Sequence, residues 1–446
     1  MIGFIKGVQI MNQNFEKKCK VCETPYLLKF QVGYVAKNHF SFECPTCGVM
    51  IEGTINVNNK ERKLDWDFDN LVDYSGDILK SKEGYFMQLT SEFYENKISL
   101  LKDYTFGTPS PFIRNFCDYI EDMNRLSSYL AEDIHQHVNR YKNLINLVLS
   151  NKNNVKYVYS EFKKLIGDLN IDEEKFTNDY KINRYNILFL AITDSIKPLL
   201  NLNAEKFQVN DIRDKLNKMY ENKVEFQRFK TSFQNSLPSL INLLTNAVYS
   251  SINIIPGIIP TIASETYNHR DIKAIKEQYG LSTANYKTLL KNYAENYEIL
   301  GKIMPLIAAI DNINTRKDIN NFIKDSTNLR KNDFLARAIA KATTSLKDFS
   351  RATIGIRIQY LKKISADDPR YNDLTVLNNR IRNAINHSSV DYDSIEQKLT
   401  FKDGEKKTER FLIEFAEENY VILYLQLYCL YIVCSLATKF SKEDNT

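Results

Sequence analysis

Arg382-Asn383-Ala384-Ile385-Asn386-His387 closes an apolar helical pattern and precedes the polar turn Ser388–Asp391. Apolar residues recur up to this point at spacings of three and four, which marks one face of a helix: Leu374, Leu377, Ile381, Ala384 and Ile385. Asn372 or Asp373 is expected to cap this helix, because a short polar side chain can accept hydrogen bonds from first-turn amides. The helix should end close to His387, where its dipole raises the proton affinity of an imidazole.

The arginine and the histidine of this stretch are candidate catalytic residues. Arginine can bind a phosphate through its planar fork, and imidazole can move a proton near neutral pH, which is most of what metal-free RNA cleavage requires. On a helix, Arg382 and His387 differ in direction by about 140°, whereas Asn383 and His387 share one stripe. The long side chain of Arg382 could still reach toward the helix end. The alternative is that both are ordinary residues on a solvated face.

The string R-N-A-I-N-H resembles the R-x4-6-H signature of the HEPN superfamily, including the polar residue that often follows the arginine. HEPN domains are small helical bundles, and many are metal-independent endoribonucleases of toxin–antitoxin, abortive-infection and CRISPR systems. The resemblance covers about two-fifths of the chain, up to a long apolar helix expected from Phe411 to Phe440. Two amphipathic helices are expected before the motif, one marked by Tyr286, Leu289, Leu290, Tyr293, Tyr297, Leu300, Met304 and Ile307 and one by Phe334, Leu335, Ala338, Ile339, Ala342, Leu346 and Phe349.

The resemblance implies a mechanism in which RNA is the substrate and supplies its own nucleophile. His387 would take a proton from a ribose 2′-OH or deliver one to the leaving 5′-oxygen, and Arg382 would stabilise charge on the phosphate. Asn383 would orient His387 or the phosphate. The product would carry a 2′,3′-cyclic phosphate, and DNA would be spared. HEPN enzymes usually dimerise so that two motifs meet, so a homodimer through the C-terminal bundle is expected.

A second candidate site lies near the N-terminus, where Cys19-Lys20-Val21-Cys22 and Cys44-Pro45-Thr46-Cys47 form a C-x2-C…C-x2-C pattern. Each C-x2-C turn lets two sulfur atoms converge, and four thiolates suit a tetrahedral zinc ion. The segment between the knuckles, Tyr26–Phe42, is rich in aromatic and β-branched residues and is expected to form strands. Cys19, Cys22, Cys44 and Cys47 are therefore predicted to hold a structural Zn²⁺ in a zinc ribbon, because a site with four cysteine ligands leaves no open position.

Other histidines and cysteines bear on this interpretation. Two disulfides are the rival reading of the four cysteines, but they need an oxidising compartment, and the first residues do not read as a secretory signal. His39 is an alternative ligand that is better explained as a strand residue. His135 and His137 point to nearly opposite sides of a helix and are expected on the surface. His269 could contribute to a site. The remaining cysteines are expected to be buried thiols: Cys117, Cys429 and Cys434.

The 446 residues predict several domains, with few Gly and Pro (14 and 10) and 43% hydrophobic residues, which favours a mainly α protein with substantial cores. We expect a zinc ribbon at 1–60, a mixed β-rich segment at 61–108, a helical middle region at 109–265 and a HEPN-like helical bundle at 266–446. Strands are expected at Tyr85–Leu89 and at Glu92–Tyr94. The net charge of +5 permits RNA binding without requiring it.

Two apolar stretches raise the question of a membrane. Val421–Thr438 is long enough for a short span, but a buried closing helix of the bundle is the favoured interpretation. Leu237–Ala263 is also apolar but holds three prolines, and its part Ile254–Pro260 is not expected to be a regular helix.

The sequence therefore predicts a cytoplasmic, zinc-ribbon-bearing HEPN ribonuclease of a bacterial anti-phage system, of the abortive-infection or toxin type. A phage trigger or an inhibitory partner would act through the ribbon and the middle region. One alternative is a zinc-ribbon adaptor that binds nucleic acid or protein without catalysis. Another is a membrane-acting effector that uses the two apolar stretches.

Overall fold

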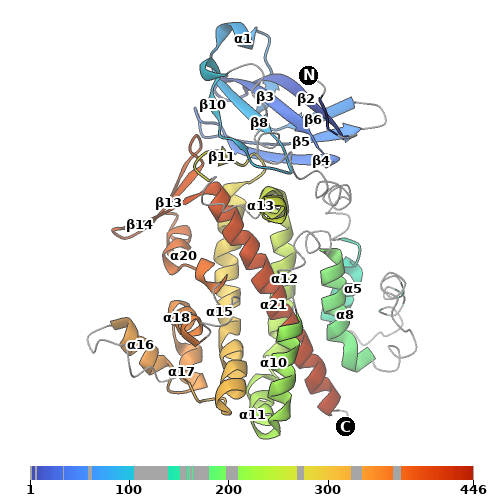
Figure 1. Cartoon of the computed structure of the whole chain (residues 1–446), viewed down its shortest axis with the longest axis vertical. Helices are drawn as coiled ribbons and strands as arrows, with labels where there is room; N and C mark the ends of the chain where they lie inside the picture. The colour runs from blue at the N-terminus through green and yellow to red at the C-terminus, as the bar shows by residue number, and fades with distance from the viewer. Residues whose placement is uncertain are drawn as a thin grey trace.

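The computed structural model places an N-terminal β-domain on one end of a body of long helices (Figure 1). The structure describes residues 3–5, 8–33, 35–58, 63–104, 139–150, 158, 160, 163, 180–196, 209–268, 276–322, 334–364 and 373–444. Cys117, His135, His137 and His269 lie outside these ranges. The predicted broad layout is confirmed: a β-rich unit that carries the four cysteines precedes a mainly helical remainder.

The β-domain comprises residues 3–104 and contains two sheets. The strands run β1 (Gly3–Ile5), β2 (Val8–Cys19), β3 (Pro25–Val32), β4 (Lys37–Glu43), β5 (Met50–Asn58), β6 (Lys63–Phe68), β7 (Leu71–Asp73), β8 (Tyr85–Leu89), β9 (Glu95–Asn96) and β10 (Ser99–Leu100), with the short helices α1 (Ile78–Ser81) and η1 (Leu101–Asp103). One sheet has the order β1-β2-β3-β8-β10, with β7 beside β2, and the other has the order β4-β5-β6. Aromatic and aliphatic side chains between the sheets form a common core.

The strand predictions for this part are confirmed at one segment and wrong at another. Tyr85–Leu89 is strand β8, and it pairs in parallel with β3, so it completes the sheet of the cysteine-bearing region. Glu92–Tyr94 is not a strand, because the chain bends there and pairing begins only at Glu95. Both Phe93 and Tyr94 are instead buried in the core shared with the helices. Aromatic composition therefore indicated burial correctly but not extended pairing.

The helical body is built around two long helices that lie side by side, α15 and α21 (Figure 1). Its elements are α5 (Lys142–Leu149), α8 (Tyr180–Ser195), α10 (Asn210–Glu221), α11 (Lys223–Phe233), α12 (Leu237–Ser251), η2 (Ile252–Ile254), α13 (Ile255–Asn268), β11 (Tyr279–Gly280), α15 (Tyr286–Arg316), α16 (Phe334–Ala342), α17 (Leu346–Arg351), α18 (Ile354–Ile364), η3 (Leu374–Val376), α20 (Asn379–Asn386), β12 (Val390–Asp393), β13 (Lys398–Asp403), β14 (Lys406–Phe411) and α21 (Leu412–Asp444). The helices expected from Tyr286 and up to Phe440 are thereby confirmed as α15 and α21.

Three helix predictions differ from the structure. Ile254–Pro260 lies in a helical run through η2 and α13. Proline is tolerated at Pro256 because first-turn amides have no partner inside a helix. The predicted helix over 334–349 is broken into α16 and α17, because Ser345 accepts from the amide of Asp348 and starts a new helix. The predicted helix before the motif begins only at Asn379, capped by Asn378 rather than by Asp373.

The two apolar stretches are buried for the most part. Leu237–Ile262 and Leu412–Asp444 are long and apolar enough to cross a membrane, and core helices of soluble proteins pass the same test. Within their most apolar windows, 67% and 78% of the residues are buried inside the protein. Cys429 and Cys434 are buried in α21, as predicted. The packing of α21 agrees with the interpretation of Val421–Thr438 as part of a buried closing helix of the bundle.

A network of buried polar side chains joins α12, α15 and α21 inside the apolar core. The Asn292 amide is the hub: its Oδ1 accepts from Ser251 Oγ at 2.9 Å, and its Nδ2 donates to Asn419 Oδ1 at 2.9 Å. Asn296 Nδ2 donates to Asn292 Oδ1 at 3.0 Å, and Gln426 Nε2 donates to Ser251 Oγ at 3.1 Å. All five residues are at most 3% exposed. Ser251, Asn419 and Gln426 of the apolar stretches are thus hydrogen-bonded into a network centred on α15.

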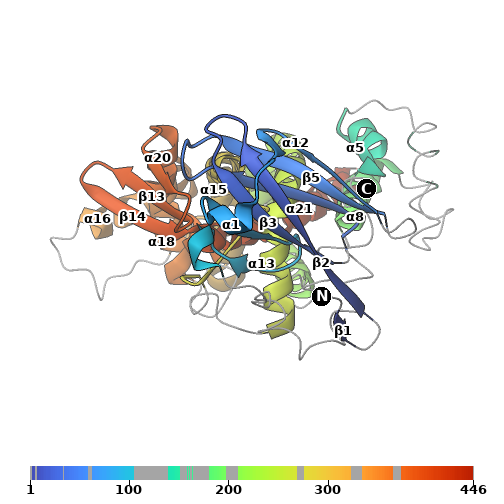
Figure 2. The same ribbon diagram turned by 90° about the horizontal axis from the view of Figure 1, so that it is seen from above.

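The β-domain and the helical body are joined by direct hydrogen bonds. Strands β9 and β11 form a two-stranded antiparallel sheet, and the amide of Ser41 donates to the carbonyl of Ser282 at 2.7 Å. From the same segment, Leu281 exchanges two hydrogen bonds with the side chain of Gln397, at 2.8 and 3.0 Å. Seen from above, the sheets lie over the ends of the long helices, with β13, β14 and α20 to one side (Figure 2). Segment 279–285 therefore contacts both the β-domain and the β12–β13 connection.

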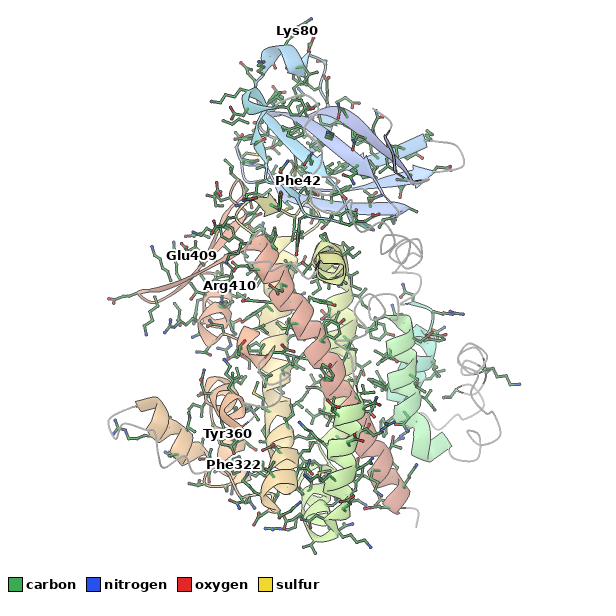
Figure 3. The ribbon with its side chains drawn as sticks, viewed as in Figure 1. Phe42, Lys80, Phe322, Tyr360, Glu409 and Arg410 are labelled. Atoms are coloured by element: carbon green, nitrogen blue, oxygen red, sulfur yellow. The ribbon has the colours of Figure 1, made fainter. Side chains whose placement is uncertain are left out.

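Side-chain packing differs between the two ends of the body (Figure 3). Far from the β-domain, Phe322 and Tyr360 pack with ring centroids 5.3 Å apart, in a cluster with Phe349. Near the β-domain, Arg410 Nε on β14 donates to Glu418 Oε1 on α21 at 2.7 Å. Burial raises the pKa of the Glu418 carboxyl to about 7, although the guanidinium opposes this shift. An aromatic cluster holds the far end, and an ion pair ties the β12–β14 sheet to α21.

Candidate metal centre and candidate active site

The four cysteines of the predicted zinc ribbon meet at one point of the β-domain. Their sulfur atoms all lie within 4.8 Å of one another, and all four thiols are free. Cys19 Sγ lies 3.8 Å from Cys47 Sγ, and Cys22 Sγ lies 3.6 Å from Cys44 Sγ. This is the one group of His, Cys, Asp or Glu ligand atoms within the described ranges that is close enough to share a metal ion. The four cysteines could therefore hold one ion.

Backbone turns position these sulfur atoms. The amide of Glu23 donates to the carbonyl of Cys19, and the amide of Gly48 donates to the carbonyl of Cys44, at 2.9 and 2.8 Å. Glu23 and Gly48 both have positive φ angles, of 61° and 72°, and Gly48 adopts this conformation without the strain that a Cβ would add. The two knuckles thus close in the same way, each with a tight turn after its first cysteine.

Neighbouring hydroxyl groups complete the surroundings of the sulfur atoms. Tyr26 Oη donates to Cys44 Sγ at 2.9 Å, and Thr24 Oγ1 lies 3.1 Å from Cys22 Sγ. Burial raises the pKa of the Cys22 thiol, but hydrogen bonds with Thr24, Cys47 and Cys19 together outweigh burial and bring the pKa down to about 6. A thiolate is the form that binds a metal, and outer hydrogen-bond donors orient such ligands. The sequence pattern identified the ligands but not these two donors.

The predicted catalytic residues lie on α20, at the side of the helical body. Arg382 and Asn383 are half-buried on this helix, and His387 is exposed at its C-terminal cap, as expected from the sequence. The amide of His387 donates to the carbonyl of Asn383 at 3.0 Å, so the imidazole follows the last turn of the helix. Ser388, with φ of 53°, then turns the chain into β12.

Arg382 and Asn383 interact directly with each other. Arg382 Nη1 donates to Asn383 Oδ1 at 2.9 Å, and Asn383 Nδ2 donates to Asp403 Oδ2 on β13 at 3.4 Å. Within the described residues 373–444, no hydrogen bond joins the side chains of Arg382 and His387. The helix therefore brings Arg382 and Asn383 together, while His387 lies at the helix end and forms no hydrogen bond with the guanidinium.

The guanidinium of Arg382 is held mainly by α15. Its Nε donates to Glu298 Oε1 at 2.7 Å, and Nη2 forms an ion pair with the same oxygen. The ring of Tyr297 lies beneath it, with 5.5 Å between Cζ and the ring centroid. The side chains of Arg382 and Glu298 are 29% and 44% exposed, so water reaches this pair. Glu298 and Tyr297 were missed in the sequence, because they lie 84 and 85 positions upstream and only the packing of α20 on α15 brings them close.

Comparison of the chain with protein-family models, with curated proteins and with solved structures gave no match.

Proposed function

We propose that the chain is a metal-independent endoribonuclease of the HEPN type, from a bacterial anti-phage system of the abortive-infection or toxin kind. The observation that carries the proposal is the solvent-exposed imidazole of His387 at the end of α20, one turn after the bonded pair of Arg382 and Asn383. An imidazole that must exchange protons with a substrate has to be accessible. A guanidinium with a water-accessible edge can bind a phosphate.

In the proposed reaction the RNA supplies the nucleophile. The ribose 2′-oxygen attacks the adjacent phosphorus, the bond to the 5′-oxygen breaks, and the product ends in a 2′,3′-cyclic phosphate. His387 of one subunit takes the 2′-OH proton, and His387 of a second subunit donates a proton to the leaving 5′-oxygen. Arg382 stabilises the charge on the phosphate oxygens, and Asn383 orients the guanidinium. One imidazole cannot serve both ends at once, which supports a homodimer through the C-terminal bundle.

Zinc is the metal that we propose for the four-cysteine cluster. Tetrahedral ligands about 2.3 Å from zinc lie about 3.8 Å from one another, and two of the sulfur pairs are 3.8 and 3.6 Å apart. Four thiolates leave no position for a substrate, so the proposed role is structural. Reduced thiols also fit a cytoplasmic location. The β-domain would present a surface to RNA, to a phage trigger or to an inhibitory partner.

His387→Ala is expected to lower RNA cleavage by at least about a hundredfold, because a positioned acid or base contributes factors of that size. The measurement is mapping of RNA ends, and of the 2′,3′-cyclic phosphate they carry, after expression of the wild type and the variant. Arg380→Ala is the matched control, since Arg380 is exposed on the same helix but outside the motif. Intact RNA under conditions in which the wild type arrests growth would refute the proposal and favour a non-catalytic adaptor.

Glu298→Gln is expected to increase cleavage by about two- to fivefold at low RNA concentration. The carboxylate competes with phosphate for Arg382, and exposed ion pairs of this kind contribute at most about 1 kcal/mol. Glu295→Gln removes the same charge one turn earlier on α15, where Glu295 lies 3.9 Å from Lys291, and is expected to leave the rate unchanged. A drop in cleavage with Glu298→Gln would mean that Glu298 positions Arg382 rather than restrains it.

A further inference from the structure

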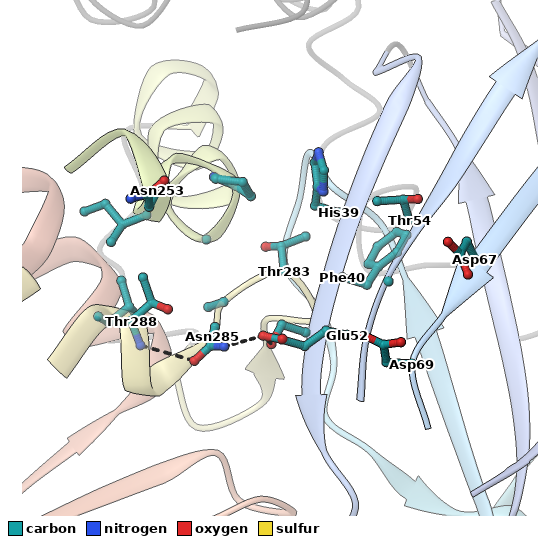
Figure 4. A pocket seen from close by; sticks show the side chains of 17 residues that line it. His39, Phe40, Glu52, Thr54, Asp67, Asp69, Asn253, Thr283, Asn285 and Thr288 are labelled. Atoms are coloured by element: carbon teal, nitrogen blue, oxygen red, sulfur yellow. Dashed lines mark hydrogen bonds between the residues drawn. The ribbon is translucent and has the colours of Figure 1, made fainter. Parts of the chain in front are cut away.

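A cavity of about 400 Å³ lies between the β-domain and the helical body (Figure 4). One wall comes from β4, β5 and β6, and the other comes from the η2–α13 junction and the N-terminal turn of α15. Cavities of this size are typical of small-molecule sites. Part of the apolar segment 254–260 lies here. Its residues Ile254, Pro256 and Gly257 belong to the wall that the helical body contributes.

The η2–α13 junction packs closely against Ala284, which lies just before α15. Pro256 and Gly257 line the cavity, and a Cβ added at Gly257 would lie 3.0 Å from the Cα of Ala284. Glycine at this position therefore lets the start of α13 pack against segment 279–285. The start of α13 therefore forms one wall of the cavity.

The wall from the β-domain is acidic. Glu52, Asp67 and Asp69 line the cavity, and none of its lining residues in the described part of the chain is lysine or arginine. Within the described ranges, none of these three carboxylates takes part in a salt bridge; Glu52 accepts hydrogen bonds from Asn285 Nδ2 and, at 3.2 Å, from Ser41 Oγ. Uncompensated carboxylates along one wall favour a cation and disfavour phosphate or RNA. The site is thus separate in its chemistry from the proposed catalytic residues.

The described residues of this cavity do not offer the three or more converging ligands of an all-protein metal site. Ligands of one ion must converge within a few ångströms, and the carboxylate and imidazole atoms of this cavity do not form such a group. The charge is instead spread along β5 and β6. A matching ligand must be extended, with its positive charges apart from one another.

The opposite wall offers hydroxyl, amide and apolar groups. Thr283 is 5% exposed, and its Oγ1 has no hydrogen-bond partner. In Figure 4 its side chain projects into the space between Asn253 and His39. A buried hydroxyl without a partner is costly, so a donor from a bound ligand would stabilise it. Pro256, which is half-buried in this wall, offers an apolar surface that suits methylene groups.

We propose that this cavity binds a small, linear organic polycation of the polyamine class. Ammonium groups would face the carboxylates of Glu52, Asp67 and Asp69, and one would donate to Thr283 Oγ1. The methylene segments between them would lie against Pro256. The ligand would bridge the β-domain and the helical body, so its binding would stabilise their contact by mass action.

Isothermal titration of the full-length protein with spermidine at low ionic strength tests the proposal. The expected result is one bound molecule per chain and a raised melting temperature. Asp67→Asn/Asp69→Asn is expected to weaken binding at least about tenfold, since two charge-assisted contacts are lost. Glu83→Gln/Asp103→Asn removes the same charge from exposed positions of the β-domain outside the cavity and should bind as the wild type does.

Thr283→Val provides a second, nearly isosteric variant that does not alter the net charge. It is expected to fold and to weaken spermidine binding about threefold to tenfold through loss of one hydrogen bond. Absence of binding to the wild type overturns the proposal. So does equal weakening in the cavity variant and its charge control, or binding that magnesium chloride abolishes at matched ionic strength, since each would indicate non-specific attraction. Adenosine monophosphate serves as an anionic probe, and its binding in the cavity would equally contradict the assignment.

Discussion

Cys44→Ser is expected to release the metal ion and to unfold the β-domain at denaturant concentrations that the wild type withstands. Binding of structural zinc contributes about 10–16 kcal/mol to small zinc domains, so loss of one ligand should cost more than about 5 kcal/mol here. Cys44 is 1% exposed and accepts from the Tyr26 hydroxyl, so the substitution also disturbs the core beside it.

Two measurements test the effect of Cys44→Ser. Elemental analysis should find one zinc per wild-type chain and none in the variant. Fluorescence of Trp66, the single tryptophan of the chain, reports on the β-domain because Trp66 lies on β6. Cys429→Ser is the control: it alters a buried thiol of α21 and should keep the metal. A Cys44→Ser protein that retains both the ion and the wild-type urea midpoint would refute the structural role.

Asn292→Leu is expected to lower the free energy of unfolding by about 3–5 kcal/mol. The substitution removes the hub of the buried network, and each buried polar group left without a partner costs about 1–3 kcal/mol. Asn419 Oδ1 loses its donor from Asn292, and Ser251 Oγ loses its 2.9 Å acceptor at Asn292 Oδ1 and keeps only the Gln426 side chain as a partner. The change therefore affects α12, α15 and α21 together, although leucine itself favours a helix.

Equilibrium unfolding in urea, followed by far-ultraviolet circular dichroism, measures this effect. Asn246→Leu is the matched control, because Asn246 is exposed on α12 and its amide donates only to Asn242 at 3.3 Å. Its expected change lies within about 0.5 kcal/mol. An Asn292→Leu protein as stable as the wild type would show that apolar packing replaces the network without loss, as happens in some buried polar clusters.

The parts of this protein that could be predicted from sequence depend on short-range geometry. The C-x2-C spacing forces two sulfur atoms to one side of a tight turn, and both knuckles form as expected. Apolar periodicity gave the starts of α15 and α21 within one residue, because burial of an apolar face dominates helix formation. The end of α15 at Arg316 lies nine residues beyond Ile307, the last residue predicted for it. The position of His387 at a helix end followed from the polar turn after it.

Predictions failed where a local signal competed with tertiary packing. Asn378 and Ser345 start new helices, although the apolar spacing runs through both positions without interruption. Pro260 lies inside α13 because packing against the core outweighs the lost backbone bond. Residues such as Glu298, Tyr297 and Thr283 carry no local mark of their role, since their importance depends on neighbours far away in the chain.

The sequence by itself determined the two C-x2-C knuckles and the helix-end position of the histidine, since each depends on residues within one or two turns of each other. Only the tertiary structure decided that Arg382 is paired with Glu298 and that Pro256 lines an acidic cavity against β5 and β6. Such pairings depend on how elements distant in sequence pack together, and their free energy comes from the whole core rather than from any one segment.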